Sequence, residues 1–191
     1  MRKLIVFNMV SVDGYFAGPN GEIDWHNIDG EFNQFSISQL QEVGALLFGR
    51  VTYDLMASYW PQASALRDDP VVANAMNNLP KVVFSKTMNQ VGWNNTKLMK
   101  EINPEEIRKM KNESGKDLFI FGSGTIVRAF TDLGLINEFR LMVNPVILGR
   151  GRGLFQDIKK KMTLKLIKTK TFGSGNILLY YQTTKEHRRE Q

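Results

Sequence analysis

The chain has 191 residues and no cysteine, so it can form neither a disulfide nor a thiolate metal site. The same absence argues against a secreted protein held together by disulfides. Only two histidines are present, His26 and His187, which is too few for a metal site built from histidine. We therefore expect no bound metal.

Long apolar runs are also absent. No stretch approaches the roughly 20 apolar residues that a membrane helix needs. Arg2 and Lys3 precede the short apolar run Leu4–Val10, but Asn8 interrupts that run and no small-residue cleavage site follows it. We expect a first strand here and not a signal peptide, and we expect a soluble, cytoplasmic protein that does not bind membranes.

The size and charge of the chain limit the number of domains and the kinds of partner that we expect. With 42% hydrophobic residues the chain can bury a sizeable core, and we expect one domain over residues 1–184 followed by a frayed, charged tail over 185–191. The net charge of +6 favours anionic partners. Lys159–Lys161 and the lysines that follow carry much of this charge, and we interpret them as a solvated edge of a hairpin, with no nucleic-acid partner.

One stretch is rich in structural signals, Asp117–Phe130. Leu118–Phe121 is continuously apolar, as a strand covered on both faces should be, and helical spacing begins after Gly122-Ser123-Gly124. A glycine turn between a strand and a helix lets the backbone approach a phosphate and directs the positive end of the helix dipole at it. The alternative is a close turn without a ligand, because Val127 stands where a full Gly-x-Gly-x-x-Gly motif has its third glycine.

The same alternation of short apolar strands and helices extends along the chain. Strands are predicted at 4–10, 44–48, 81–85, 97–99, 118–121 and 138–143, and helices at 31–42, 49–57, 71–79 and 103–112 and after the glycine turn. Loops are predicted at 11–30, 58–70 and 144–155, and a β-hairpin at 162–183. This pattern predicts an α/β fold with three layers, α/β/α, whose central sheet is mostly parallel and ends in antiparallel strands.

Polar or glycine-rich residues follow four of the predicted strands, at 10–13, 48–52, 84–86 and 121–125. In an open parallel sheet, ligands bind beyond the carboxyl ends of the strands. Arg50 and Thr52 lie at a helix start there, where a guanidinium, a hydroxyl and free backbone N–H groups suit an anion. Together the four strand ends predict a nucleotide site.

These segments resemble the dihydrofolate reductase superfamily, and within it the reductase domain of the bifunctional riboflavin-biosynthesis deaminase/reductase. Ser11–Gly14 is similar to the Ser-x-Asp-Gly segment of that branch, and Leu47–Tyr53 to its Gly-Arg-x-Thr-aromatic segment. Phe121–Gly124 stands at the family's glycine turn, and Asn144–Phe155 is similar to the Pro-x-x-Leu-Gly and Leu-Phe stretch of the riboflavin branch. The sequence contains no deaminase segment with zinc-binding His and Cys residues, so we do not expect it to be the bifunctional enzyme.

The resemblance implies NADPH as the hydride donor. The residues that it places around the cofactor fall into three groups: Gly49, Arg50 and Thr52 at the phosphates, Ser85 and Lys86 at the adenosine 2′-phosphate, and Gly122, Ser123, Gly124 and Thr125 at the pyrophosphate and nicotinamide. Cationic and hydroxyl donors around a phosphate favour NADPH over NADH.

Two acids are candidates for catalysis on the substrate side. The resemblance implies that Asp13 meets a ribosylaminopyrimidine, and that an acid at the first helix pairs with a heterocycle. Glu31 is favoured over Asp29 for the second role, because Phe35 follows it by one helical turn. The alternatives are a turn-stabilising side chain for Asp13 and a solvated acid for Glu31.

The function that we predict is an NADPH-dependent reductase of a pyrimidine or pteridine heterocycle, most like 5-amino-6-(5-phosphoribosylamino)uracil reductase. Dihydrofolate reductase is the alternative substrate class, and a nucleotide-binding module without turnover is the alternative of another kind. The resemblance also implies a homodimer, in which the apolar strand Ile177–Tyr181 would take part.

Overall fold

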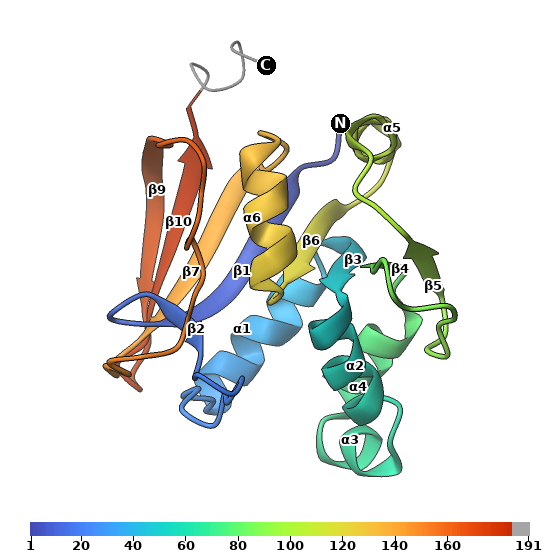
Figure 1. Ribbon diagram of the computed structural model, residues 1–191. Coiled ribbons are helices and arrows are strands. Elements are labelled where there is room, and N and C mark those ends of the chain that lie inside the picture. Colours follow the sequence, from blue (N-terminus) through green and yellow to red (C-terminus); the bar gives the residue numbers. More distant parts are fainter. Residues whose placement is uncertain (185–191) are drawn as a thin grey trace.

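A sheet of eight strands forms the centre of the computed structural model, which describes residues 1–184 (Figure 1). Its strands follow the order β5-β4-β3-β6-β1-β7-β10-β9. Their bounds are β1 (Leu4–Ser11), β3 (Val43–Gly49), β4 (Lys81–Phe84), β5 (Thr96–Met99), β6 (Asp117–Phe121), β7 (Glu138–Asn144), β9 (Leu164–Thr171) and β10 (Ile177–Thr183). The predicted charged tail, 185–191, lies outside the described residues.

The strand directions confirm the predicted mixture of parallel and antiparallel pairing. All pairs from β5 to β7 are parallel, and β1 lies between β6 and β7, with Ile5 opposite both Phe119 and Glu138. The pairs of β10 with β7 and with β9 are antiparallel. The carboxyl ends of β1, β3, β4 and β6 therefore meet at one edge of the sheet.

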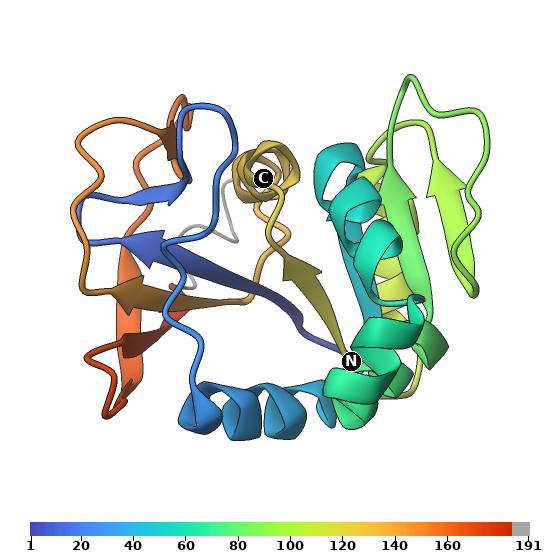
Figure 2. The same cartoon turned by 90° about the horizontal axis from the view of Figure 1, so that it is seen from below.

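Helices cover both faces and complete the three predicted layers. Their bounds are α1 (Gly30–Leu40), α2 (Arg50–Tyr59), α3 (Ala63–Asp68), α4 (Pro70–Asn78), α5 (Pro104–Asn112) and α6 (Gly124–Asp132). Buried side chains of α5 and α6 pack on one face of the sheet, and those of α1, α2 and α4 pack on the other. Figure 2 shows α6 and α1 on opposite sides of the strands.

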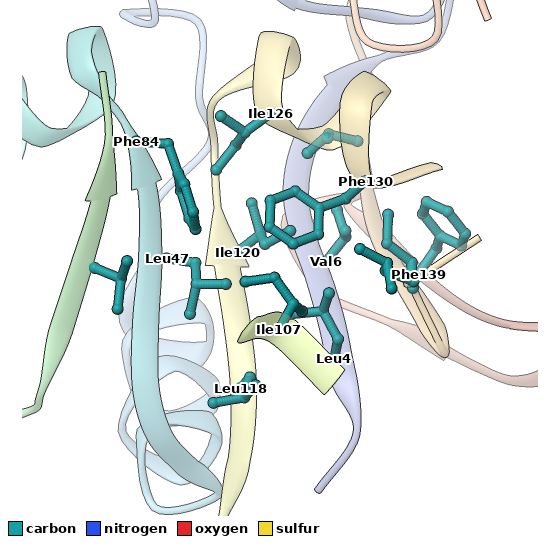
Figure 3. Packing of buried hydrophobic residues seen from close by; sticks show 14 of the residues in the cluster. Leu4, Val6, Leu47, Phe84, Ile107, Leu118, Ile120, Ile126, Phe130 and Phe139 are labelled. Carbon is teal, nitrogen blue, oxygen red and sulfur yellow. The ribbon is translucent and has the colours of Figure 1, made fainter. Parts of the chain in front are cut away.

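The core arises from the alternation of side chains along the strands. In β1, Leu4 and Val6 point to the face covered by α5 and α6, whereas Ile5 points to the opposite face. Figure 3 shows Ile107 of α5 and Phe130 of α6 packed against the first of these faces. Because both faces are covered, β1 and β6 are apolar almost throughout.

Three of the predicted loops contain short elements that the pattern missed. The loop after β1 includes β2 (Tyr15–Ala17), which pairs with β8 (Arg152–Gly153) in the predicted loop 144–155. The predicted loop 58–70 includes α3. Segments of two to six residues are too short to show a hydrophobic period, so pairing between distant loops decides them.

Candidate functional site

The turn between β6 and α6 has an unusual backbone conformation. Gly122 and Ser123 have φ of 65° and 58°, so two consecutive residues adopt left-handed conformations before the helix begins at Gly124. Glycine takes this conformation freely, but a serine there costs about 1 kcal/mol. Such strain in a non-glycine residue is concentrated at functional sites.

The side chain of Ser123 connects this turn to the neighbouring strand end. Its Oγ accepts a hydrogen bond of 2.8 Å from the buried N–H of Gly49 and donates one of 2.7 Å to Thr52 Oγ1. A Cβ at Gly122 would lie 3.0 Å from Thr52 Cγ2, so the Thr52 side chain packs closely against the backbone of the turn. The structure thus brings together four of the predicted cofactor residues, Gly49, Thr52, Gly122 and Ser123.

The helices that begin at this point have N-termini without side-chain caps. Asp29, Asp69 and Asn103 cap α1, α4 and α5 by accepting backbone N–H groups. The N-cap residues of α2 and α6, Gly49 and Ser123, make no such bond, and the short α3 also lacks one. Two positive dipole ends joined through Ser123 therefore offer backbone donors to an anion.

Phe16 lies against the N-terminus of α6, and the sequence did not indicate this contact. A Cβ built on Gly124 would lie 2.5 Å from Cε1 of the Phe16 ring, so only glycine fits beneath the ring. The pairing of β2 with β8 holds Phe16 in place. The loop after β1 consequently reaches the candidate site.

The other predicted cofactor residues lie at the starts of α2 and α6 and after β4. The Arg50 side chain is half-exposed, and its Nη1 lies 3.6 Å from Asp54 Oδ2. Ser85 follows β4, whose last residue pairs with Gly49, and its Oγ accepts the N–H of Met88 at 3.0 Å. Lys86 and Thr125 are exposed and complete the predicted set.

Asp13 makes the contacts of a turn-stabilising carboxylate. It accepts the hydroxyl of Ser11 at 2.6 Å and the backbone N–H groups of Leu148 and Gly149 at 3.2 and 2.7 Å. These donors, first of all the Ser11 hydroxyl, hold the pKa of Asp13 below its usual value. The carboxylate joins the loop after β1 to the segment after β7 and remains exposed to solvent.

Of the two candidate acids at the start of α1, Glu31 contacts the C-terminal hairpin and Asp29 caps the helix. Glu31 Oε2 accepts the N–H of Gly173 at 2.9 Å, and its Oε1 lies 3.6 Å from Lys170 Nζ. Asp29 caps α1 by accepting the N–H of Phe32 at 2.8 Å. No contact between described residues joins Glu31 to Ser123 or Thr52.

Three asparagines form a further cluster that the sequence reasoning missed. The N–H of Asn27 donates to Asn144 Oδ1 at 2.9 Å, and Asn176 Nδ2 donates to the Asn27 carbonyl at 2.8 Å. Asn144 and Asn176 are fully buried. The sequence does contain a signal for this cluster, because both asparagines lie at the ends of apolar strands. A buried amide needs hydrogen-bond partners, so such a position predicts a polar contact.

Two further observations concern the described residues. Within 1–184 no three His, Asp or Glu side chains are grouped so that they could hold a metal ion. No helix in that range is both long and apolar enough to cross a membrane.

A mostly parallel sheet with a glycine turn between β6 and α6 defines the dihydrofolate reductase-like class of folds. The structure of dihydrofolate reductase from Enterococcus faecalis, complexed with NADP(H), is similar to this one with a TM-score of 0.64, at 14% identity, over 95% of this chain and 96% of that one. At that identity the similarity concerns the fold alone.

The chain belongs to the RibD C-terminal domain family, which matches residues 2–178. It is 34% identical to the uncharacterized protein YyaP of Bacillus subtilis (strain 168) over 94% of both chains. A putative riboflavin biosynthesis protein from Shewanella sp. PV-4 has a similar structure, with a TM-score of 0.73 and 25% identity over 95% of this chain and 99% of that one. The family and these neighbours identify a RibD-like, reductase-type domain, as the sequence resemblance implied.

Proposed function

We propose that the protein is an NADPH-dependent reductase that transfers a hydride to a pyrimidine- or pteridine-type heterocycle, most like 5-amino-6-(5-phosphoribosylamino)uracil. The observation that carries this proposal is the pair of uncapped helix N-termini joined through Ser123. Membership of the RibD C-terminal domain family supports the reductase chemistry.

The residues at these strand ends fit a dinucleotide. Glycine stands where the space is tightest: a Cβ at Gly49 would lie 3.1 Å from Ser123 Oγ. The backbone N–H groups that open α2 and α6 would hold the phosphates, with Arg50 and Thr125 beside them. Ser85 and Lys86 would hold the 2′-phosphate. NADPH, when bound, supplies the hydride.

On the substrate side we propose roles for Asp13 and Glu31. Asp13 is exposed, and the Glu31 side chain is 40% exposed, so a ligand can reach both carboxylates. Each is also held by backbone N–H groups, which fixes its position. A fixed carboxylate can orient a heterocycle by accepting two of its N–H groups or can bias its protonation.

A titration with NADPH and with NADH tests the cofactor. We expect NADPH to bind the wild-type protein more tightly, and Arg50→Ala to weaken NADPH binding about tenfold, or about 1.4 kcal/mol, because a charge-assisted phosphate contact is lost. Arg67→Ala is the matched control, since Arg67 is also exposed and paired with an aspartate, Asp68. Calorimetry measures both affinities.

Failure to bind either nucleotide would overturn the proposal. Binding without oxidation of NADPH in the presence of ribosylaminopyrimidines or dihydrofolate would leave a nucleotide-binding module. Oxidation with dihydrofolate alone would favour the other substrate class.

We also propose that the protein acts in the cytoplasm as a homodimer. The hairpin of β9 and β10 supports the dimer, because Leu166 and Ile177 are large apolar side chains that are 48% and 40% exposed on it. By the strand register both lie on one face of the hairpin, toward its two ends, and exposed apolar side chains on one face favour a protein interface.

A further inference from the structure

A pocket of about 290 Å³ lies between α1 and the C-terminal hairpin, away from the candidate nucleotide site. Phe35 and Ser38 of α1 and Glu42, which follows the helix, line one side, and Lys168, Lys170 and Tyr180 of β9 and β10 line the other. None of its lining residues comes from α2, α6 or the glycine turn. The pocket is therefore separate from the proposed nucleotide site, and its Lys170 pairs with the proposed substrate acid Glu31.

The acidic groups near the pocket are paired with a buried arginine. Arg140 is only 7% exposed, and its guanidinium donates to Glu138 at 2.8 Å and to Glu42 at 2.7 Å. It also lies 5.3 Å from the centre of the Tyr180 ring. Glu138 also lies 3.3 Å from Lys3 Nζ, so two cations, Arg140 and Lys3, balance the two carboxylates and the group carries no net negative charge.

Most donors at the rim of the pocket, by contrast, have no hydrogen-bond or carboxylate partner among the described residues. Among residues 1–184 no carboxylate pairs with Lys168, and neither the Tyr180 hydroxyl nor the Ser38 hydroxyl makes a hydrogen bond. Burial raises the pKa of Tyr180, so its hydroxyl keeps its proton and can donate. Lys170 pairs with Glu31 at 3.6 Å.

The pocket also has an aromatic wall. Phe35 is buried and its ring contacts that of Phe172 at 5.8 Å, edge to face. The Lys168 and Lys170 ammonium groups lie 5.5 Å from the Tyr180 ring and 4.4 Å from the Phe172 ring. Apolar rings beside unpaired donors suit a planar molecule that carries one negative charge.

We infer that the pocket between α1 and the hairpin is a second ligand site, which takes a small aromatic carboxylate. The ring of the ligand packs against Phe35 and Tyr180, and its carboxylate accepts the Lys168 ammonium and the Tyr180 hydroxyl. Lys170 lies beside the carboxylate and is shared with Glu31. Aromatic acids the size of benzoate fit the volume.

Fluorine NMR with 4-fluorobenzoate tests this site on the full-length protein. We expect binding with a dissociation constant on the order of 1 mM, as for a good ligand of this size. The neutral analogue 4-fluorobenzamide should bind at least about fivefold more weakly, since it lacks the charge that Lys168 and Tyr180 recognise. Saturating NADPH should not displace the acid.

Substitutions in the pocket test whether 4-fluorobenzoate binds there. Lys168→Gln and Tyr180→Phe should each weaken 4-fluorobenzoate binding, the first by about fivefold or more. Lys165→Gln removes the same charge from the same strand outside the pocket lining and should leave binding unchanged. The inference is wrong if wild-type protein does not bind the acid, if Lys168→Gln binds it equally well, or if NADPH displaces it. A protein that binds the acid but no nucleotide would refute only the proposed reductase.

Discussion

At the scale of single residues, His26 shows how a loop can depend on pH. It lies in the loop before α1 beside Trp25, whose ring it meets edge to face at 4.5 Å, and its Nε2 is buried without a partner among the described residues. Burial lowers the pKa of His26 to about 4, against the opposing effect of Asp24. The histidine is therefore neutral in the folded protein at pH 7.

This lowered pKa predicts a loss of stability in acid. Between pH 6.5 and 4 the unfolded chain binds a proton at His26 that the folded chain does not, so stability rises with pH through that window and is lost as pH falls. The loss from pH 7 to pH 5 should be about 2 kcal/mol for this one group. Urea unfolding at both pH values measures it.

His26→Gln supplies the comparison, because glutamine does not titrate. The free energy of unfolding of the variant should fall less between pH 7 and pH 5 than that of the wild type. Equal losses in the two proteins would contradict the prediction, since the carboxylates that titrate in acid are common to both.

At the scale of elements, the decisive contact joins the end of β3 to the start of α6. Ser123→Ala keeps the left-handed backbone but removes the oxygen that accepts the buried Gly49 N–H, which should cost about 2 kcal/mol of stability. Ser123→Gly removes the same oxygen but also relieves the strain at φ 58°, so it should be about 1 kcal/mol more stable than the alanine variant. Thermal or urea unfolding measures both, and a glycine variant less stable than the alanine variant would contradict this account.

Local sequence patterns predicted most of the elements but not the contacts between distant loops. The strands, the main helices and the meeting of four strand ends followed from local periodicity, so Gly49, Thr52, Gly122 and Ser123 could be predicted as neighbours. The Phe16 ring on Gly124 could not, because it depends on the pairing of β2 with β8, more than 130 residues apart. The contacts of Asp13 and Glu31 likewise join distant segments, and no local pattern encodes them.

At the scale of the whole molecule, the hairpin has one apolar and one polar face. Tyr181 packs against the core beneath α6 and pairs with Leu166, and Ile177 is on the same face. Tyr180 and Lys168 are on the opposite face. A dimer formed through Leu166 and Ile177 would therefore leave the pocket between α1 and the hairpin accessible.

Sedimentation equilibrium tests the dimer. We expect a dimer at micromolar concentration, and Ile177→Lys should weaken it at least about tenfold by placing a charge in an apolar contact. Leu66→Lys, an exposed position on α3, is the control. A wild-type protein that is only monomeric at this concentration would refute the proposed dimer.

The position of β1 in the sheet also orders events during synthesis. Its partners are β6, where Leu4 meets Leu118, and β7, where Ile5 meets Glu138. Because the ribosome synthesises a chain from its N-terminus, β1 is made more than 110 residues before these partners. Until then β1 has two open edges, so the strand at the centre of the finished sheet is the one most exposed to aggregation in the nascent chain.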